Sequence, residues 1–305
     1  MVNLFDYNSK ILNLQAINNN IDKNKLATFR KNICRSKNKN INYKENINPS
    51  IKNTVIFITL SELNKCKIII LKQLLSSKYN IVIGFDTKYY KNKNEVNKEI
   101  CTFKDFIETE LKMKVNLFIN IQKIELNNDV NMKKYGHKIA NFNGKWTNNP
   151  SKFGALSWFY STKYEYMWNI EDDVYSKDYD TFFNDYNNNN DDLICTISEN
   201  HLPPWFYDNW RVGSVDHGFD LAYLFIVRYS KQFCNRFFNY IKITTLTSHH
   251  EIFIPYILNY YHLKHKNINS YHKKYLHLNN HKNSMIFNES NIDTLDSIIF
   301  HPFKL

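Results

Sequence analysis

Short apolar segments alternate with helix-like segments between residues 53 and 121, and this alternation constrains the fold more than any other feature of the sequence. Residues 54–60 and 80–85 are rich in β-branched residues and lack polar alternation, which is typical of strands buried on both faces. Between them Ser61 can cap a helix whose apolar positions, Leu63, Ile68, Leu71 and Leu75, recur at helical spacing. A third apolar run at 115–121 follows an amphipathic stretch at 103–111. The pattern predicts an α/β fold with a parallel sheet.

The second half of the chain continues this alternation. A polar, Asn-rich loop is predicted at 126–150, a helix at 151–160 and a strand at 164–170 that ends in Glu171-Asp172-Asp173. Ser176 or Asp178 can cap the next helix, which carries Tyr179, Phe182, Phe183 and Tyr186. Residues 192–197 then resemble another strand. The acidic triplet is therefore predicted at the C-terminal tip of a sheet strand.

The formal net charge of +11 is unevenly distributed. Residues 1–150 contain 26 Lys and Arg against 12 Asp and Glu, whereas residues 151–305 contain 14 against 17. We interpret residues 1–52 as a polar, basic N-terminal extension and residues 53–305 as one compact domain. The basic stretches are interrupted by Asn and lack interleaved aromatic residues, so no specific nucleic-acid partner is expected.

Cysteine usage and hydropathy indicate the compartment. The five cysteines form no CxxC pair, which argues against a disulfide framework or a zinc knuckle and favours a reducing compartment. The sequence has no apolar run of about 18 residues and no recognisable secretory signal. A cytoplasmic protein without a transmembrane segment is the expectation.

The acidic triplet suggests a cation site. Alternate side chains of an extended strand share a face, so Glu171 and Asp173 are expected to point one way and Asp172 the other. Two converging carboxylates repel each other unless a cation or hydrogen bonds compensate. Hard oxygen ligands suit Mg²⁺ or Mn²⁺, which commonly bridge protein carboxylates to a substrate diphosphate. The alternative is that the triplet merely begins a solvated turn.

The segment YEYMWNIEDDV, at 164–174, resembles the Asp-x-Asp-type motif of GT-A-fold glycosyltransferases, particularly those whose motif reads Glu-Asp-Asp. Two later segments, at 249–255 and 298–304, agree with this resemblance. It implies that residues 53–305 are a single GT-A-like, Rossmann-like catalytic domain with a mixed, mostly parallel sheet flanked by helices. The nucleotide-binding half would lie at about 53–174 and the acceptor-binding half at about 175–305. The implied activity is metal-dependent transfer of a hexosyl or N-acetylhexosaminyl group from a nucleoside-diphosphate sugar, preferably a UDP-sugar, to a hydroxyl of a glycan or other acceptor.

The resemblance also implies roles for individual residues. Asp173 would contact Mn²⁺ or Mg²⁺, Glu171 and Asp172 would support the metal or the ribose, and His301 would complete the metal site. Glu251 is the preferred catalytic base, with Asp216 and Asp220 as rivals; a base-driven single displacement would invert the anomeric configuration. A carboxylate in the first turn of a helix, such as Glu251, is also favoured by the helix dipole alone.

Further contacts are expected from topology and composition. Asp86 and Ser61 follow strands at positions where related enzymes hold the nucleotide, although a cap or turn role is equally compatible with them. Trp205 and Trp210, in an aromatic loop, and His250 are candidate acceptor contacts, with core packing as the alternative for the aromatics.

Two other functional classes stay open at this point. A metal-dependent nuclease or phosphohydrolase would use the same carboxylates to activate water. A non-catalytic sugar- or protein-binding domain would retain the fold without the activity.

Overall fold

The structure is a computed structural model that describes residues 53–60, 64–86, 98, 101, 105, 106, 108, 116–120, 150–198, 221–243, 250–273 and 298–302. Its strands are β1 (Thr54–Leu60), β2 (Asn80–Asp86), β3 (Asn116–Asn120), β4 (Tyr166–Ile170), β5 (Tyr175–Ser176), β6 (Leu193–Ser198), β7 (Leu221–Ser230), β8 (His265–Asn267) and β9 (Ile299–Phe300). Its helices are α3 (Lys65–Leu75), α6 (Pro150–Tyr160), α7 (Tyr179–Asn184), α9 (Lys231–Ile243), α10 (His250–Tyr260) and α11 (Ser270–Lys273).

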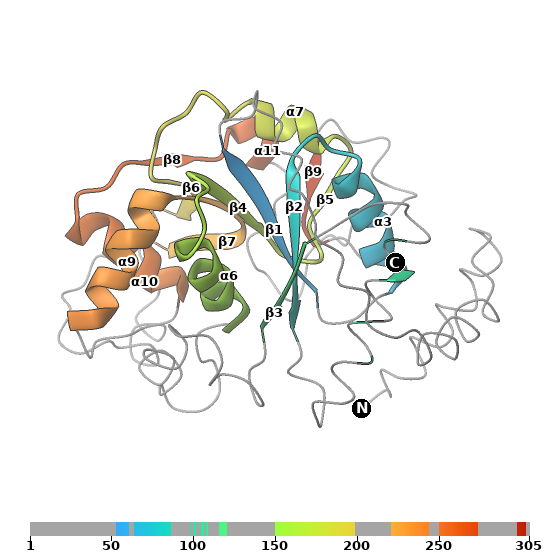
Figure 1. The fold of residues 1–305 in the computed structure, drawn as a ribbon. Coiled ribbons are helices and arrows are strands. Elements are labelled where there is room, and N and C mark those ends of the chain that lie inside the picture. The colour runs from blue at the N-terminus through green and yellow to red at the C-terminus, as the bar shows by residue number, and fades with distance from the viewer. Residues whose placement is uncertain are drawn as a thin grey trace, which may run out of the picture.

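The main sheet has seven strands in the order β3-β2-β1-β4-β7-β6-β8 (Figure 1). Strands β3, β2, β1 and β4 run parallel to one another, β7 runs antiparallel to both β4 and β6, and β8 is parallel to β6. A separate two-stranded sheet pairs β5 with β9. The predicted α/β class, a mixed and mostly parallel sheet flanked by helices, is confirmed.

Helices cover both faces of the main sheet, and two apolar cores fill the space between. One core packs α3, α7 and β9 against the sheet, and the other packs α6, α9 and α10 against the opposite face (Figure 1). Strand β1 contributes to both, since Ile56 and Ile58 lie in the first core and Val55 and Phe57 in the second. This two-sided burial explains why the strand sequence is apolar at consecutive positions.

The helix caps confirm one expectation and correct another. Asn64, not Ser61, caps α3: its side chain accepts a hydrogen bond from Lys67 N, and the helix begins four residues later than Ser61. A cap must lie immediately before the first helical turn, which excludes Ser61 from this role. Of the two candidates for α7, Asp178 is the cap, and its side chain accepts from Thr181 N.

The C-terminal segment docks onto the strand that follows the acidic triplet. Ile299 and Phe300 are fully buried, and Tyr175 pairs with Phe300 in an antiparallel ladder. The hydroxyl of Ser176 donates to the carbonyl of Ile298 at 2.8 Å. The segment that precedes His301 is therefore anchored to the domain by apolar burial and backbone pairing.

Other expectations lie partly outside the described residues. These include the basic extension at 1–52 and most of the polar loop at 126–150.

The described cysteines, Cys66, Cys101, Cys195 and Cys234, are free thiols. Within the described part of the chain, every helix is too short or too polar to cross a membrane.

Candidate metal centre

The acidic triplet lies in a turn between β4 and β5. After β4 ends at Ile170, Glu171 N still donates to the carbonyl of Phe225 on β7 at 2.8 Å, and the backbone then turns, with Val174 N donating to Glu171 O at 3.3 Å. Strand β5 begins one residue later and pairs with β9. This pairing brings His301, which directly follows β9, beside the triplet despite the long separation in sequence.

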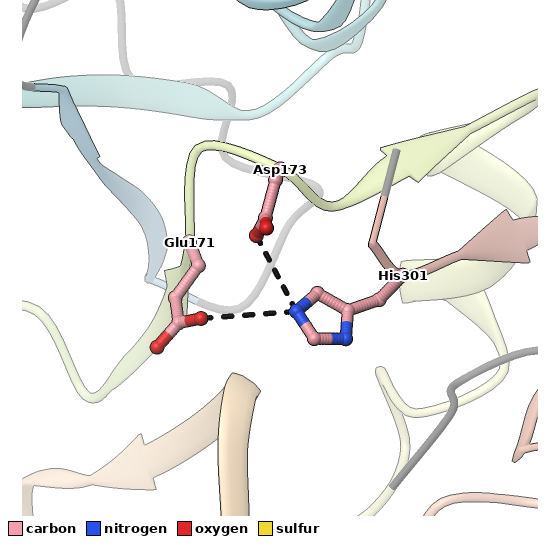
Figure 2. Close-up of side chains that lie close together, drawn as sticks. All are labelled: Glu171, Asp173 and His301. Atoms are coloured by element: carbon pink, nitrogen blue, oxygen red, sulfur yellow. Dashed lines mark ion pairs between the residues drawn. The ribbon is translucent and has the colours of Figure 1, made fainter. Parts of the chain in front are cut away.

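Glu171, Asp173 and His301 converge on one point (Figure 2). His301 Nε2 lies 3.4 Å from Asp173 Oδ1 and 3.9 Å from Glu171 Oε2. The expectation that Glu171 and Asp173 share a side is met, but by a turn rather than by strand alternation. The extended geometry assumed for the triplet was wrong, because the ladder with β7 ends at Glu171.

The ring of His301 is held in place on one face. It stacks on Phe225, with ring centroids 4.4 Å apart and an interplanar angle of 14°, and its side chain is only 16% exposed. Nε2 faces the two carboxylates, whereas the buried Nδ1 has no hydrogen-bond partner among the described residues. The side chain therefore presents a single nitrogen to the acidic pair.

The cluster fits a divalent cation. At metal–ligand distances of about 2.1 Å, two ligand atoms of an octahedral site lie about 3.0 Å apart when adjacent and about 4.2 Å apart when opposite. The two measured separations, 3.4 and 3.9 Å, fall between these values, and all three ligand atoms lie within 4.8 Å of one another. Two carboxylates and one imidazole are compatible with Mn²⁺ or Mg²⁺.

Asp172 forms an ion pair outside this cluster. Its Oδ2 lies 2.5 Å from Nζ of Lys67, in the first turn of α3. Burial raises the pKa of Asp172 and the Lys67 ammonium opposes that rise, so the ion pair favours the charged carboxylate. Asp172 thus has an ionic partner of its own and is not one of the three converging residues.

A second lysine contacts the cluster from α6. Lys152 is only 4% exposed; its Nζ lies 3.1 Å from Glu171 Oε1 and donates a hydrogen bond to the carbonyl of Leu224 on β7. Glu171 therefore places one carboxylate oxygen toward Lys152 and the other toward His301. The sequence reasoning missed Lys152 and Lys67.

Glu251 lies in the first turn of α10 and is coupled electrostatically to the same cluster. Burial raises its pKa to about 7, the Glu171 carboxylate adds to the rise, and the Lys152 ammonium counteracts it. The carboxyl group therefore changes its protonation state close to neutral pH. His250 begins the same helix and is partly buried.

The remaining candidates are not brought to the site by the described part of the structure. Asp86 is the last residue of β2. Ser61, Trp205, Trp210, Asp216 and Asp220 lie outside the described residues, so their nucleotide, acceptor and base roles stay predictions.

Comparison with known proteins gives weak similarity at the level of structure only. No protein-family model matches the sequence, and no curated protein matches it. The inositol-1-phosphate CTP transferase from T. maritima superposes with a TM-score of 0.38 at 7% identity, covering 72% of this chain and 85% of its own. A putative nucleotide-diphospho-sugar transferase from Desulfovibrio desulfuricans G20 gives 0.36 at 11% identity, covering 71% and 79%.

Proposed function

We propose that this protein is a metal-dependent transferase that moves a sugar from a nucleoside-diphosphate sugar to a hydroxyl acceptor. The observation on which the proposal depends is the convergence of Glu171, Asp173 and His301 at the C-terminal end of β4. In open α/β sheets this edge is where ligands bind. The Glu-Asp-Asp sequence at this position is also the segment that resembles GT-A glycosyltransferases.

Each side chain has a distinct task in this proposal. Glu171, Asp173 and His301 would hold Mn²⁺ or Mg²⁺, and the ion, when bound, would offset negative charge on the leaving diphosphate. Phe225 keeps the imidazole of His301 oriented toward the carboxylates. Lys152 fixes the orientation of Glu171.

Glu251 is the proposed general base. Its pKa of about 7 matches what proton abstraction from an acceptor hydroxyl at neutral pH requires, since a base works best when its pKa lies near the working pH. The proton would move from the acceptor hydroxyl to a carboxylate oxygen of Glu251 as that hydroxyl attacks the anomeric carbon. A single displacement of this kind inverts the anomeric configuration.

The test combines binding and slow donor hydrolysis. Mn²⁺ together with a panel of nucleotide-sugars, including UDP-sugars, should raise the melting temperature, and released nucleoside diphosphate should accumulate. His301→Ala should reduce both effects, whereas His265→Ala, on the exposed strand β8, should reduce neither. Cleavage of DNA or RNA without binding of any nucleotide-sugar would contradict the proposal and favour a nuclease.

A further inference from the structure

We propose that Tyr179 is a positioning residue of the metal centre, because its hydroxyl fixes the turn that carries Asp173. This inference rests on the proposed function and deepens it by adding a residue outside the metal-ligand set. Tyr179 is the first residue of α7, and its hydroxyl donates to the carbonyl of Val174 at 2.7 Å. Val174 directly follows Asp173 in the chain.

The ring of Tyr179 is held in place by the core. The residue is only 2% exposed and packs in the same apolar core as Phe182 and Phe183, the other buried residues of α7. It stacks on Phe183, with ring centroids 5.7 Å apart and an interplanar angle of 16°. The hydroxyl therefore reaches Val174 from a side chain that has little freedom to move.

Packing alone does not account for the hydroxyl. A phenylalanine would fill nearly the same space, as Phe182 and Phe183 do on the same helix. A buried hydroxyl loses its hydrogen bonds to water and needs a partner in the protein, which is here the carbonyl of the fully buried Val174. Burial also raises the pKa of Tyr179, so the hydroxyl stays protonated and remains a donor in neutral solution.

This bond constrains the turn more tightly than the hydrogen bond within the turn itself. Val174 N donates to Glu171 O at 3.3 Å, beyond the usual N–H···O range of about 2.7–3.2 Å. The Tyr179 bond, at 2.7 Å, has the usual length for a hydroxyl donor. Oδ1 of Asp173 lies 3.4 Å from Nε2 of His301, so a shift of the turn would change the spacing of two metal ligands (Figure 2).

A second buried hydroxyl fixes β5, the strand that follows the turn. Ser176 has no solvent exposure; its hydroxyl accepts from Asp178 N at 3.1 Å and donates to the carbonyl of Ile298 at 2.8 Å. The end of the turn is thus held to α7 by Tyr179 and to the C-terminal segment by Ser176.

The experiment measures Mn²⁺ affinity by titration calorimetry, at a temperature where every variant is fully folded. Tyr179→Phe removes only the hydroxyl. Loss of a hydrogen bond that orients a metal ligand commonly weakens metal binding by about 10- to 100-fold, and Tyr179 acts through the backbone, so we expect about tenfold. Tyr186→Phe is the matched control. Its ring is fully buried in the same core and its hydroxyl accepts from Asn269 N at 2.9 Å.

A double-mutant cycle separates positioning from a general effect on the fold. If Tyr179 acts through Asp173, its hydroxyl matters less once the carboxylate is gone. In the Asp173→Asn background, Tyr179→Phe should therefore weaken Mn²⁺ binding by less than about threefold. A merely structural role would give the same loss in both backgrounds.

A second variant covers the case in which Tyr179→Phe does not fold. Ser176→Ala should weaken Mn²⁺ binding by about threefold. Its control is Ser230→Ala, because the Ser230 hydroxyl also accepts from a backbone amide, that of Phe233, and donates to an oxygen, Oδ1 of Asp192. This control and Tyr186→Phe should both keep the Mn²⁺ affinity within about twofold of the wild type.

Three results would overturn the inference and leave the proposed function intact. These are an unchanged Mn²⁺ affinity in the folded variant, an equal loss in its control, and an equal loss of Tyr179→Phe in the two backgrounds. Failure of the wild type to bind Mn²⁺ would overturn both.

Discussion

Removal of the charge of Asp173 should separate metal binding from folding. Asp173→Asn keeps the size of the side chain and one oxygen ligand but removes a full negative charge from the cluster with Glu171 and His301. Because the side chain is 31% exposed, folding does not depend on burying it. The substitution therefore tests the metal centre rather than the fold.

The expected magnitude follows from the charge and the ligand distance. A divalent cation and a carboxylate about 2.1 Å apart attract each other by about 4 kcal/mol even at the dielectric constant of water. The asparagine oxygen retains part of this interaction. We expect a loss of about 2 to 3 kcal/mol, which corresponds to a dissociation constant for Mn²⁺ about 30- to 140-fold larger.

The assay is titration with Mn²⁺, followed by calorimetry or by the electron paramagnetic resonance signal of the free ion. Glu165→Gln is the matched control, since it removes the same charge from an exposed residue just before the opposite end of β4. The melting temperature without metal should stay constant or rise slightly in Asp173→Asn, because repulsion from Glu171 is relieved. An Mn²⁺ affinity within threefold of the wild type would refute the assignment of this cluster as a metal centre.

Three further substitutions test neighbouring parts of the structure. Glu251→Gln should abolish turnover while Mn²⁺ affinity persists; wild-type activity should fall as the pH drops below about 7, where the base becomes protonated. Folding raises the pKa of Glu251 from 4.5 to about 7, so the wild type loses stability as the pH rises through this range. Glu251→Gln carries no such charge, and its melting temperature should therefore be higher than that of the wild type at pH 8 but not at pH 4. A wild-type rate that does not fall below about pH 7 would contradict the role of Glu251 as the base. Asn64→Ala removes the cap that accepts from Lys67 N and should cost about 1 kcal/mol in denaturant unfolding, whereas Asn64→Asp should not. Arg228→Lys loses the fork that donates to the carbonyls of Tyr186 and Asn189 and should lower the free energy of unfolding by about 2 kcal/mol; equal stability would show that these bonds contribute little.

The strands could be predicted because their periodicity is local. The run at 54–60 is apolar at consecutive positions since alternate residues of β1 enter different cores, and the same property reveals β2 and β4. Strand order cannot be read in this way. That β7 lies antiparallel between β4 and β6 depends on long-range contacts, and nothing in its own sequence specifies its neighbours.

The acidic part of the site was visible in the sequence, and its basic part was not. Glu-Asp-Asp follows directly on a strand, so the change from core to charge is abrupt. Lys152 lies in α6 and Lys67 in α3, and a solvent-facing position is the usual expectation for a lysine in a helix. A signal was nevertheless present: Lys152 precedes Leu156 and Phe159 by four and seven residues, on the buried stripe of α6.

Pairing of the tail with β5 determines how the centre assembles. Ile299 and Phe300 are completely buried, and burial of two such side chains stabilises the docked tail by about 3 to 6 kcal/mol. Since His301 is the next residue and stacks on Phe225, its imidazole is placed by apolar packing and needs no metal to hold it there. The carboxylate of Glu171 is likewise positioned in advance, because it forms an ion pair with the buried Lys152. A cation entering this centre would therefore meet ligands already oriented, and its binding energy would not be spent on ordering the tail.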